Sequence, residues 1–408
     1  MQKLIRAVSL CAGKNKVKAY LVGGIVRDLI LKKANFDLDI VVEADAIEFA
    51  KILSSYLGVD FRRHYNFKTA TVLSLPYKID LASARREFYP YSGSLPRIEL
   101  SNLRDDLGRR DFSINAMALS LNKGSFAKLI DYFGGFSDLN KGVIRILHED
   151  SFLEDPTRLF RAIRFKERFN FKFSPKTSRF LKQAVKKKAL SFVNEHRLRD
   201  ELVLILSEKE PLKCIRTLNK SIGFDFLAVS ELEKSDFLFF QRLRSAVLWF
   251  SRKFPSQRKL EKWIIYLMGL FKNTPLPKLR QVLAKFGFRR GERIRLLSSK
   301  RIRVLDKLSA KASPSKIHKL LDPFSFETII FFYALSSCKL ARKNIEDFFC
   351  KHSKVRLKIK GGMLAHLGLL PQAMYAKVLK KILYKKIDGK ITSKSDEFRE
   401  AKRHLRSN

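Results

Sequence analysis

Strand-like and helix-like spacings of apolar residues alternate over the first part of the chain. Apolar residues at every second position favour strands, and apolar residues three to four apart favour helices. The predicted elements are, in order, a strand at 18–22 that ends in Gly23 and Gly24, a helix from 25, a strand at 37–42, a helix at 46–57, β-rich segments at 68–75 and 78–84, helical signals at 101–118, and a strand pair at 117–121 and 126–130. We therefore expect an α+β head with a small mixed sheet.

The pattern changes after Asp150, where strand signals almost vanish. Amphipathic helices are predicted at 153–169, 177–190 and 196–208, and the rest of the chain continues in the same way. The sequence thus predicts three parts, which are a head at 1–145, a helical neck at 146–210, and an all-α body and tail at 211–408.

The net charge of +43 is unevenly distributed between these parts. Residues 1–210 carry 38 basic and 25 acidic side chains, a net +13, whereas residues 211–408 carry 45 and 15, a net +30. Such a balance favours a polyanionic partner, because basic side chains release counterions when they bind phosphates. A lysine-rich proteome is the alternative source of the charge. We expect the second half to bind nucleic acid.

Several classes of protein are disfavoured by what the sequence lacks. It contains no apolar run of about 18 residues and no secretory signal pattern at its start, so neither a membrane span nor export is expected. The four cysteines are scattered without a CxxC pair, which favours a reducing compartment, and we expect the cytoplasm. The glycine motifs of P-loop and dinucleotide-binding proteins are missing as well.

Two carboxylates lie close together at the start of a predicted strand. Asp37 and Asp39 are two residues apart, so both side chains point to the same face of the strand. Paired carboxylates repel one another unless a hard cation lies between them, and the usual cation is Mg²⁺. Asp80, on a later strand, is a candidate third carboxylate. A DxD pair alone is weak evidence, but this arrangement suits two-metal nucleotidyl transfer.

A glycine turn precedes the carboxylate pair. Gly23 and Gly24 fall between a predicted strand and a predicted helix, where backbone N–H groups can approach a phosphate closely. Arg27 follows in the first helical turn and would reach the same phosphate. The turn and the carboxylates together indicate a site for a nucleotide and a metal.

Four motifs in the expected order resemble the class II tRNA nucleotidyltransferase / bacterial poly(A) polymerase family. The matching stretches are GGIVRD at 23–28 with DLDIVV at 37–42, RRDFSINAM at 109–117, DYFGG at 131–135 with Asp138, and EDPTRLFRAIRF at 154–165. A weaker similarity extends over 357–383 near the C-terminus. The resemblance implies a head with a nucleotidyltransferase fold like that of DNA polymerase β.

The resemblance also implies roles for particular residues. In relatives, the positions of Asp37 and Asp39 bind the catalytic metal, and Asp80 matches the third carboxylate. The positions that would hold the nucleotide are Gly23, Gly24, Arg27 and Arg110. Asp111 is not expected to bind the metal, because a structural interpretation explains it equally well. It would be a helix N-cap or an ion-pair partner of the adjacent arginines.

The motif that begins at Glu154 offers a way to choose a base. Asp155 and Pro156 are typical of a plain helix start, which is the structural alternative. Cytosine and adenine both place an amino donor beside a ring acceptor, which a carboxylate and a guanidinium would satisfy, whereas uracil and guanine invert this pattern. By resemblance, Asp155 and Arg158 recognise the base, and Arg161 and Arg164 support it and the phosphates. His196 stands where relatives carry a glutamate, which affects local packing.

The expected function is Mg²⁺-dependent addition of CMP and/or AMP, from CTP and ATP, to the 3′ end of tRNA. A poly(A) polymerase and a CC-only or A-only enzyme are the alternatives within the family, and an RNA-binding protein with a degenerate head is the non-enzymatic one. An irregular stretch at 87–97, with two prolines and a glycine, predicts a mobile loop that governs the choice between these additions. The lysines expected to contact RNA are Lys358, Lys360, Lys380 and Lys381.

Overall fold

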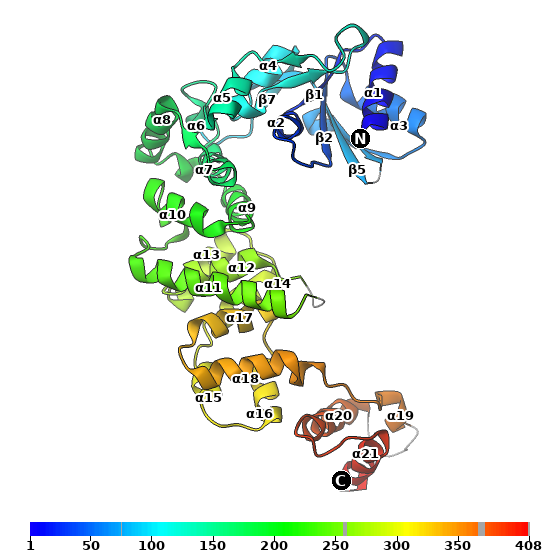
Figure 1. Ribbon diagram of the computed structural model, residues 1–408, viewed down its shortest axis with the longest axis vertical. Coiled ribbons are helices and arrows are strands. Elements are labelled where there is room, and N and C mark those ends of the chain that lie inside the picture. Colours follow the sequence, from blue (N-terminus) through cyan, green and yellow to red (C-terminus); the bar gives the residue numbers. More distant parts are fainter. Residues whose placement is uncertain (75, 256–258, 366–371, 407–408) are drawn as a thin grey trace. The chain divides into compact units, whose positions relative to one another are not determined.

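The computed structural model describes residues 1–74, 76–255, 259–365 and 372–406. The chain divides into two units, Met1–Phe226 and Leu227–Asn408, and each is described by itself (Figure 1). Residues 366–371 of the C-terminal similarity at 357–383 lie outside the described residues.

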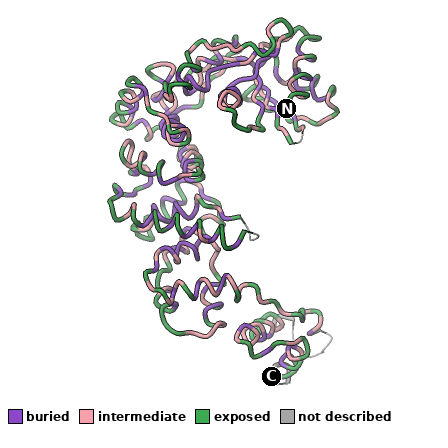
Figure 2. Tube along the Cα trace, in the orientation of Figure 1, coloured by how far each residue is buried: buried purple, intermediate pink, exposed green. Residues whose placement is uncertain are grey.

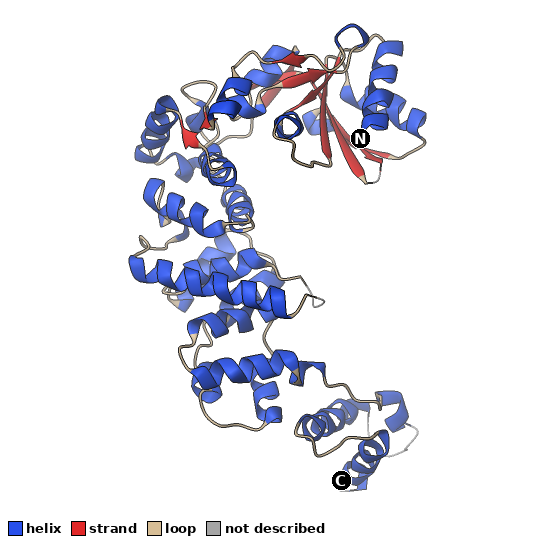
Figure 3. Cartoon of the chain, in the orientation of Figure 1, coloured by secondary structure: helices blue, strands red, loops and turns tan. Residues whose placement is uncertain are grey.

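A mixed sheet forms the first part of the N-terminal unit (Figure 3). Its strand order is β3-β4-β5-β2-β1-β8-β9, in which only β2 and β5 pair in parallel. The strands are β1 (Ala19–Val22), β2 (Asp37–Val42), β3 (Phe61–His64), β4 (Thr69–Ser74), β5 (Tyr77–Ser83), β8 (Ala118–Ser120) and β9 (Leu129–Ile130). The predicted α+β head with a small mixed sheet is confirmed.

Two helices, α1 (Gln2–Lys14) and α3 (Ala46–Leu57), pack against each other and build a hydrophobic core with the sheet. The carboxylate of Asp45 caps α3 by accepting hydrogen bonds from the N–H groups of Ile47 and Glu48. The helix ends at Gly58, which takes the left-handed backbone conformation typical of this position. The buried face of α3 therefore fixes the sheet from which β2 presents its carboxylates.

The prediction of a loop at 87–97 is wrong at both ends of this stretch, which belong to strands. The chain forms a hairpin there, in which β6 (Arg85–Phe88) pairs antiparallel with β7 (Arg97–Leu100). Cross-strand ion pairing stabilises it, because Arg86 binds Glu99. Only the residues between these strands connect them as a loop.

The second part of the N-terminal unit is mainly helical. Its helices are α5 (Gly135–Lys141), α6 (Ser151–Glu154), α7 (Arg158–Phe169), α8 (Pro175–Lys186), α9 (Glu195–Leu206) and α10 (Pro211–Ser221), with the short strands β10 (Val143–Ile144) and β11 (Lys172–Phe173). Two further helices belong to the first part, where α2 (Gly24–Ile30) packs on β1 and β2, and α4 (Leu103–Gly108) on β6. The single helix predicted at 153–169 is interrupted because Asp155 precedes a proline and takes an extended backbone conformation. Since α10 packs on α7 and α9, it belongs to this unit. The division into head, neck and body stays a prediction.

The C-terminal unit is helical throughout its described residues (Figure 3). Its helices are α11 (Lys234–Lys253), α12 (Lys262–Leu270), α13 (Leu276–Lys285), α14 (Arg290–Ser298), α15 (Val304–Leu308), α16 (Pro314–Leu321), α17 (Phe326–Leu335), α18 (Lys339–Cys350), α19 (Gly361–Ala365), α20 (Gln372–Ile387) and α21 (Lys394–Arg406). Phenylalanines such as Phe239, Phe240 and Phe332 are buried in its core (Figure 2). A separate small core joins α19, α20 and α21. No described helix of either unit is long and apolar enough to cross a membrane.

Candidate functional site

A polar cavity of about 590 Å³ in the N-terminal unit brings most of the predicted site residues together. The predicted residues that line it are Gly23, Gly24, Arg27, Asp37, Asp39, Arg110, Asp155, Arg158, Arg161 and Arg164. The cavity is further lined by Glu87, Tyr89, Arg109, Asp111, Asn115, Phe165 and Arg168. We call it the arginine cavity.

Asp37 and Asp39 stand on the face of β2 that borders this cavity. Leu38 between them points into the core, as the alternation of a strand requires. Burial raises the pKa of the Asp39 carboxyl, and the nearby guanidinium of Arg110 offsets this only in part. Two carboxylates on one strand face, with the charge of Asp39 disfavoured by burial, fit a divalent cation such as Mg²⁺. This ion commonly takes one or two protein carboxylates and completes its shell with phosphate oxygens and water.

Asp80 lies next to Asp39 in the paired strands β2 and β5 but faces other partners. One of its oxygens accepts a hydrogen bond from Thr71 Oγ1 at 2.7 Å, and the other lies 2.6 Å from Lys78 Nζ. It lines a neighbouring cavity of about 460 Å³, to which Asp39 also contributes. Within the described part of the chain, no three acidic, histidine or cysteine side chains converge on one point. The role of Asp80 as a third ligand stays a prediction.

The glycine turn approaches the carboxylates closely. Gly23 has a φ of +74°, and a Cβ added there would lie 2.7 Å from Nη1 of Arg110 and 3.7 Å from Oδ2 of Asp39. Only glycine fits such a backbone beside these two side chains. This explains the glycine at position 23 by space as well as by conformation.

Arg27 is held rigidly at the edge of the cavity. Its Nη1 donates to Oδ1 of Asn115 at 2.6 Å, and its Nε donates to Oδ1 of Asp28 at 2.9 Å. The guanidinium lies 5.3 Å and 4.8 Å from the ring centres of Phe165 and Phe169. Burial lowers the pKa of Arg27, and the Asp28 carboxylate opposes this shift. The side chain therefore keeps its charge in a fixed position.

Asp106 organises the two adjacent arginines, Arg109 and Arg110. Its carboxylate is fully buried and binds Arg109 Nη2 at 2.7 Å and Arg110 Nη2 at 3.0 Å. Burial by itself would raise the pKa of Asp106, but the two guanidinium groups outweigh it and lower the pKa. Arg109 also binds Glu87 of the hairpin at 2.8 Å. The roles of Asp106 and Glu87 were not predicted from the sequence. The signal for Asp106 was present, because side chains three and four residues apart are neighbours on a helix surface.

Asp111 is an ion-pair partner, but of a distant arginine. Its Oδ1 accepts hydrogen bonds from the N–H of Phe112 and from Asn115 Nδ2, and its Oδ2 accepts from Arg161 Nε at 2.8 Å. Burial opposes ionisation, yet Arg161 and Asn115 together lower the pKa of Asp111. The predicted pairing with the adjacent arginines is therefore wrong, because the arginine that binds Asp111 is Arg161. The predicted helix N-cap is wrong as well, because the only backbone N–H group that donates to the carboxylate is that of Phe112, which itself precedes the next short helix.

The proposed base-recognition pair, Asp155 and Arg158, is fixed from several sides. Oδ1 of Asp155 accepts from the N–H and the hydroxyl of Thr157 and from Arg197 Nη2 at 2.9 Å, while no described residue donates a hydrogen bond to Oδ2. Arg158 donates to Ser151 Oγ at 2.8 Å and to the carbonyl of Arg109 at 2.7 Å. Asp155 thus forms a turn with Thr157 before α7, whose N-cap is Thr157, so the structural interpretation of Asp155 as the N-cap places the helix start two residues too early.

Arg161 and Arg164 share a half-buried acid from α9. Their guanidinium groups lie 3.7 Å from the two carboxylate oxygens of Glu201. Burial raises the pKa of Glu201. Glu201 and Arg197 were not assigned to the site from the sequence, although both lie in the stretch that follows His196. The side chain of His196 is exposed, so its departure from the family pattern does not disturb this packing.

The four lysines predicted to contact RNA lie on the surface of the C-terminal unit. Lys358, Lys360, Lys380 and Lys381 are all exposed. Lys360 and Lys380 border a pocket, whereas Lys358 and Lys381 are not part of its lining. Their role in RNA binding stays a prediction.

Known proteins resemble this chain over its whole length. The family described as poly A polymerase head domain matches residues 19–145. An A-adding tRNA nucleotidyltransferase of Geobacter sulfurreducens is 33% identical over 98% of this chain, which spans 46% of that protein's length. A protein of the same name from Halalkalibacterium halodurans is 31% identical over 98% of this chain and 92% of its own length.

Solved structures agree with these relatives. The structure of a Thermotoga maritima CCA-adding enzyme complexed with tRNA_CCA superposes with a TM-score of 0.74 and 33% identity, over 99% of this chain and 95% of that one. The fold, the order of the motifs and the near-complete coverage of the Halalkalibacterium protein confirm the resemblance found in the sequence. The chain belongs to the tRNA nucleotidyltransferase family.

Proposed function

We propose that this protein adds nucleotides to the 3′ end of tRNA, with AMP from ATP as the expected addition and CMP from CTP as the related one. The observation that carries the proposal is the arginine cavity, in which a same-face carboxylate pair, a glycine turn and a base-recognition pair converge. An RNA-binding protein with a degenerate head would have no reason to keep these groups together.

Asp37 and Asp39 would hold Mg²⁺, which when bound lowers the pKa of the attacking 3′-hydroxyl and neutralises charge on the phosphates. The chain's own contribution is to place the carboxylates on a rigid strand next to Gly23. Arg110 stands between Asp39 and the glycine turn and would meet the triphosphate there.

Unsatisfied donors in the cavity support an anionic ligand. Nε of Arg110 and Nε of Arg164 are buried and find no hydrogen-bond acceptor among the described residues. Buried donors without partners are costly, and phosphate oxygens would satisfy them. The carboxylates of Asp106, Asp111 and Glu201 keep the remaining guanidinium atoms in place before the nucleotide binds.

Base choice follows from the groups that remain available after these internal bonds. Asp155 retains Oδ2 as an acceptor. Both hydrogens of Arg158 Nη1 are used by Ser151, whereas Nη2 donates only to the carbonyl of Arg109 and keeps its second hydrogen for a ligand. An acceptor beside a donor complements adenine and cytosine and leaves buried groups unpaired with uracil or guanine. The two relatives named above that cover the whole chain are A-adding, which supports ATP as the first candidate.

The test is incubation of the purified chain and Mg²⁺ with tRNA transcripts that lack CCA, end in C, or end in CC, and with an unrelated RNA primer, each with a single nucleotide. We expect AMP on the transcript that ends in CC. Addition of CMP to the shorter transcripts would extend the activity to CC or CCA, and repeated AMP on the unrelated primer would indicate a poly(A) polymerase. No incorporation on any primer would overturn the proposal.

A further inference from the structure

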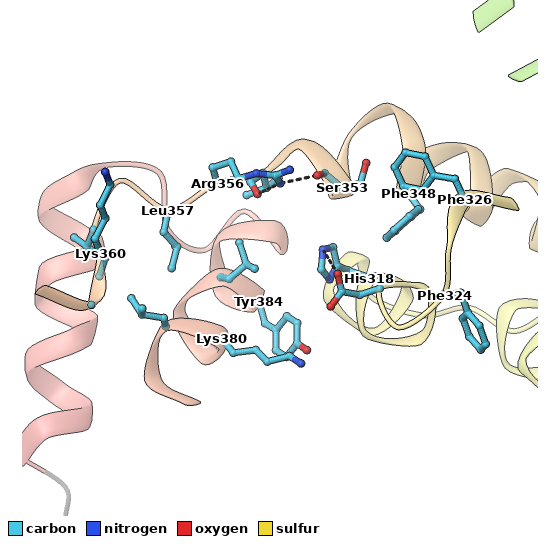
Figure 4. A pocket seen from close by; sticks show the side chains of 16 residues that line it. His318, Phe324, Phe326, Phe348, Ser353, Arg356, Leu357, Lys360, Lys380 and Tyr384 are labelled. Atoms are coloured by element: carbon cyan, nitrogen blue, oxygen red, sulfur yellow. Dashed lines mark hydrogen bonds and ion pairs between the residues drawn. The ribbon is translucent and has the colours of Figure 1, made fainter. Parts of the chain in front are cut away.

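A second pocket, of about 800 Å³, lies within the C-terminal unit and is independent of the arginine cavity. Its walls come from α16, the end of α18, the segment at 353–361 and α20 (Figure 4). The hydroxyl and N–H of Ser315 at the start of α16 donate to the carboxylate of Asp388 just after α20, which ties these elements together. We call it the tail pocket.

The walls of the tail pocket are apolar and aromatic. Phe324, Phe348, Leu357 and Leu379 line it, and the ring of Phe348 lies 5.6 Å from that of His318. Such a lining suits a flat ring system, because aromatic rings pack well in offset or edge-to-face arrangements and bury apolar surface.

Two polar atoms in this lining have no partner among the described residues. They are Nδ1 of His318 and the hydroxyl of Tyr384, and both atoms are buried. His318 is only 6% exposed, and its ring lies 6.2 Å from that of Tyr384. Leaving a buried polar group without a hydrogen bond is costly, so two such atoms on neighbouring rings point to a ligand that pairs with them.

Cations surround the same pocket. Arg356, Lys360 and Lys380 contribute to its lining with one carboxylate, Asp322, and that acid lies 4.0 Å from His318 Nε2. Lys360 and Lys380 are exposed. Arg356 donates to the carbonyls of Ser353 and Val355, which positions its guanidinium. The rim therefore favours an anion beside the apolar interior.

We propose that the tail pocket binds a nucleotide, with its base against the aromatic wall and its phosphate at the cationic rim. A nucleobase offers hydrogen-bonding groups to His318 and Tyr384, whereas an acyl chain would leave both unpaired and a free phosphate would not use the apolar wall. The nucleotide is either an unstacked residue of bound RNA or a free mononucleotide. Only the choice of tRNA as the RNA depends on the proposed function.

The decisive variant is Tyr384→Phe, which removes the hydroxyl and keeps the ring. Because the hydroxyl has no partner in the described fold, the variant should unfold at the same temperature as the wild type or slightly higher. Its affinity for the ligand should fall about two- to tenfold, the usual effect of one hydrogen bond. Binding of a tRNA transcript is measured by fluorescence anisotropy, and binding of AMP and CMP by equilibrium dialysis of the full chain.

Two matched pairs of lysine variants distinguish binding in the pocket from a general effect of positive charge. Lys360→Gln with Lys380→Gln removes two charges at the rim, and Lys358→Gln with Lys381→Gln removes two charges beside it. We expect the first pair to weaken ligand binding more than the second, although both have the same net charge. These binding measurements do not depend on nucleotide addition, so a failure of the proposed activity is recognised separately.

The two sources of the nucleotide give different results. The wild-type chain is expected to bind one mononucleotide in the arginine cavity. If it binds no second one, and Tyr384→Phe loses tRNA affinity, the pocket holds a residue of bound RNA. A second bound AMP or CMP that disappears in Tyr384→Phe assigns it to a free nucleotide. Unchanged binding of tRNA and of both mononucleotides in Tyr384→Phe would overturn the proposal, whatever the lysine pairs show.

Discussion

The arginine cavity and the tail pocket present their positive charges in opposite ways. In the arginine cavity the guanidinium groups are paired inside the protein, with Asp106, Asp111 and Glu201, before any ligand arrives. In the tail pocket the lysines are exposed, and much of the wall is aromatic. Paired and buried charges hold a defined geometry, which catalysis requires, while exposed charges attract any polyanion.

The distribution of charge along the sequence agrees with this contrast. Residues 1–210 carry a net +13 and residues 211–408 a net +30, because the first part contains the acids that pair with its arginines. The segment with the higher net charge is thus not the segment that contains the candidate active site. The acids among the arginines are a better guide to that site.

The largest expected effect is the loss of nucleotide addition in Asp39→Ala. Removing a metal-binding carboxylate should lower kcat by about 10³-fold or more, since charge stabilisation by a metal is worth several kcal/mol. The tRNA dissociation constant should stay unchanged, because RNA affinity is assigned to the other unit. Single-turnover kinetics and anisotropy measure the two quantities, with the exposed Asp60→Asn as control. Normal turnover in Asp39→Ala would remove the carboxylate pair from the mechanism.

Asp106→Asn tests whether the paired charges support the fold of the N-terminal unit. Leaving two buried guanidinium groups without their acid should lower the free energy of unfolding by about 3 kcal/mol at pH 7. The pKa of Asp106 is lowered in the folded state, so its contribution is present above its unfolded pKa and is lost as pH falls through the folded value.

The difference between the wild type and Asp106→Asn should therefore narrow as the pH falls below about 4. Urea denaturation at a series of pH values measures it, with Asp60→Asn again as control. A difference that does not depend on pH would mean that packing, rather than the ion pairs, explains the loss.

Asp155→Asn addresses base choice within the arginine cavity. The change keeps the size of the side chain but replaces a carboxylate with an amide, so kcat/KM for ATP should fall by roughly 10- to 100-fold, as expected when a hydrogen bond to a charged group is removed. Discrimination against UTP and GTP should weaken at the same time. The exposed Asp150→Asn serves as control. If Asp155→Asn changes kcat/KM by the same factor for all four nucleotides, Asp155 is only a turn residue.

Gly23→Ala tests the close approach of the backbone to Arg110. The new Cβ would lie 2.7 Å from Nη1 of Arg110 on a backbone with φ of +74°, so Arg110 must move. We expect kcat/KM for the nucleotide to fall about tenfold or more, because displacing a positioning group by about 1 Å has effects of this order. Gly124→Ala, where a Cβ meets nothing within 4 Å, should keep full activity. Equal activity of the two variants would show that the site tolerates the shift.

The smallest effect is expected from the lysines of the C-terminal unit. Changing Lys358, Lys360, Lys380 and Lys381 to glutamine should weaken tRNA binding moderately and make it less dependent on salt. The slope of log K against log salt should become shallower by roughly 0.7 to 0.9 for each phosphate that the variant no longer neutralises. Titration against KCl measures the slope, and an unchanged slope would place the RNA on other cations.

The elements that local sequence determines were predicted well. The helix at 46–57 agrees with α3 at both ends, since Asp45 caps it and Gly58 ends it. The hairpin of β6 and β7 was missed, because its prolines and glycine lie in the connecting loop and suggested irregular chain throughout. The break before α7 was predicted only in part, because Asp155 and Pro156 indicate a helix start while the apolar periodicity predicted one helix over 153–169.

The same limit applies to the site. The pair Asp37 and Asp39 follows from spacing within one strand, and the structure places both at the arginine cavity. Arg197 and Glu201 interact with Asp155 and Arg161 from another helix, about 40 positions further along the sequence, and no local pattern indicates such pairings. Asp80 shows the converse, since a strand position beside Asp39 did not determine where its side chain would bind.

The most direct test of the account is a crystal structure of the chain with a non-hydrolysable ATP analogue and Mg²⁺. The account predicts the metal on Asp37 and Asp39, the triphosphate at Gly23 and Arg110, and the adenine edge on Asp155 and Arg158. An analogue bound away from the arginine cavity, or a metal held without Asp37 and Asp39, would contradict it.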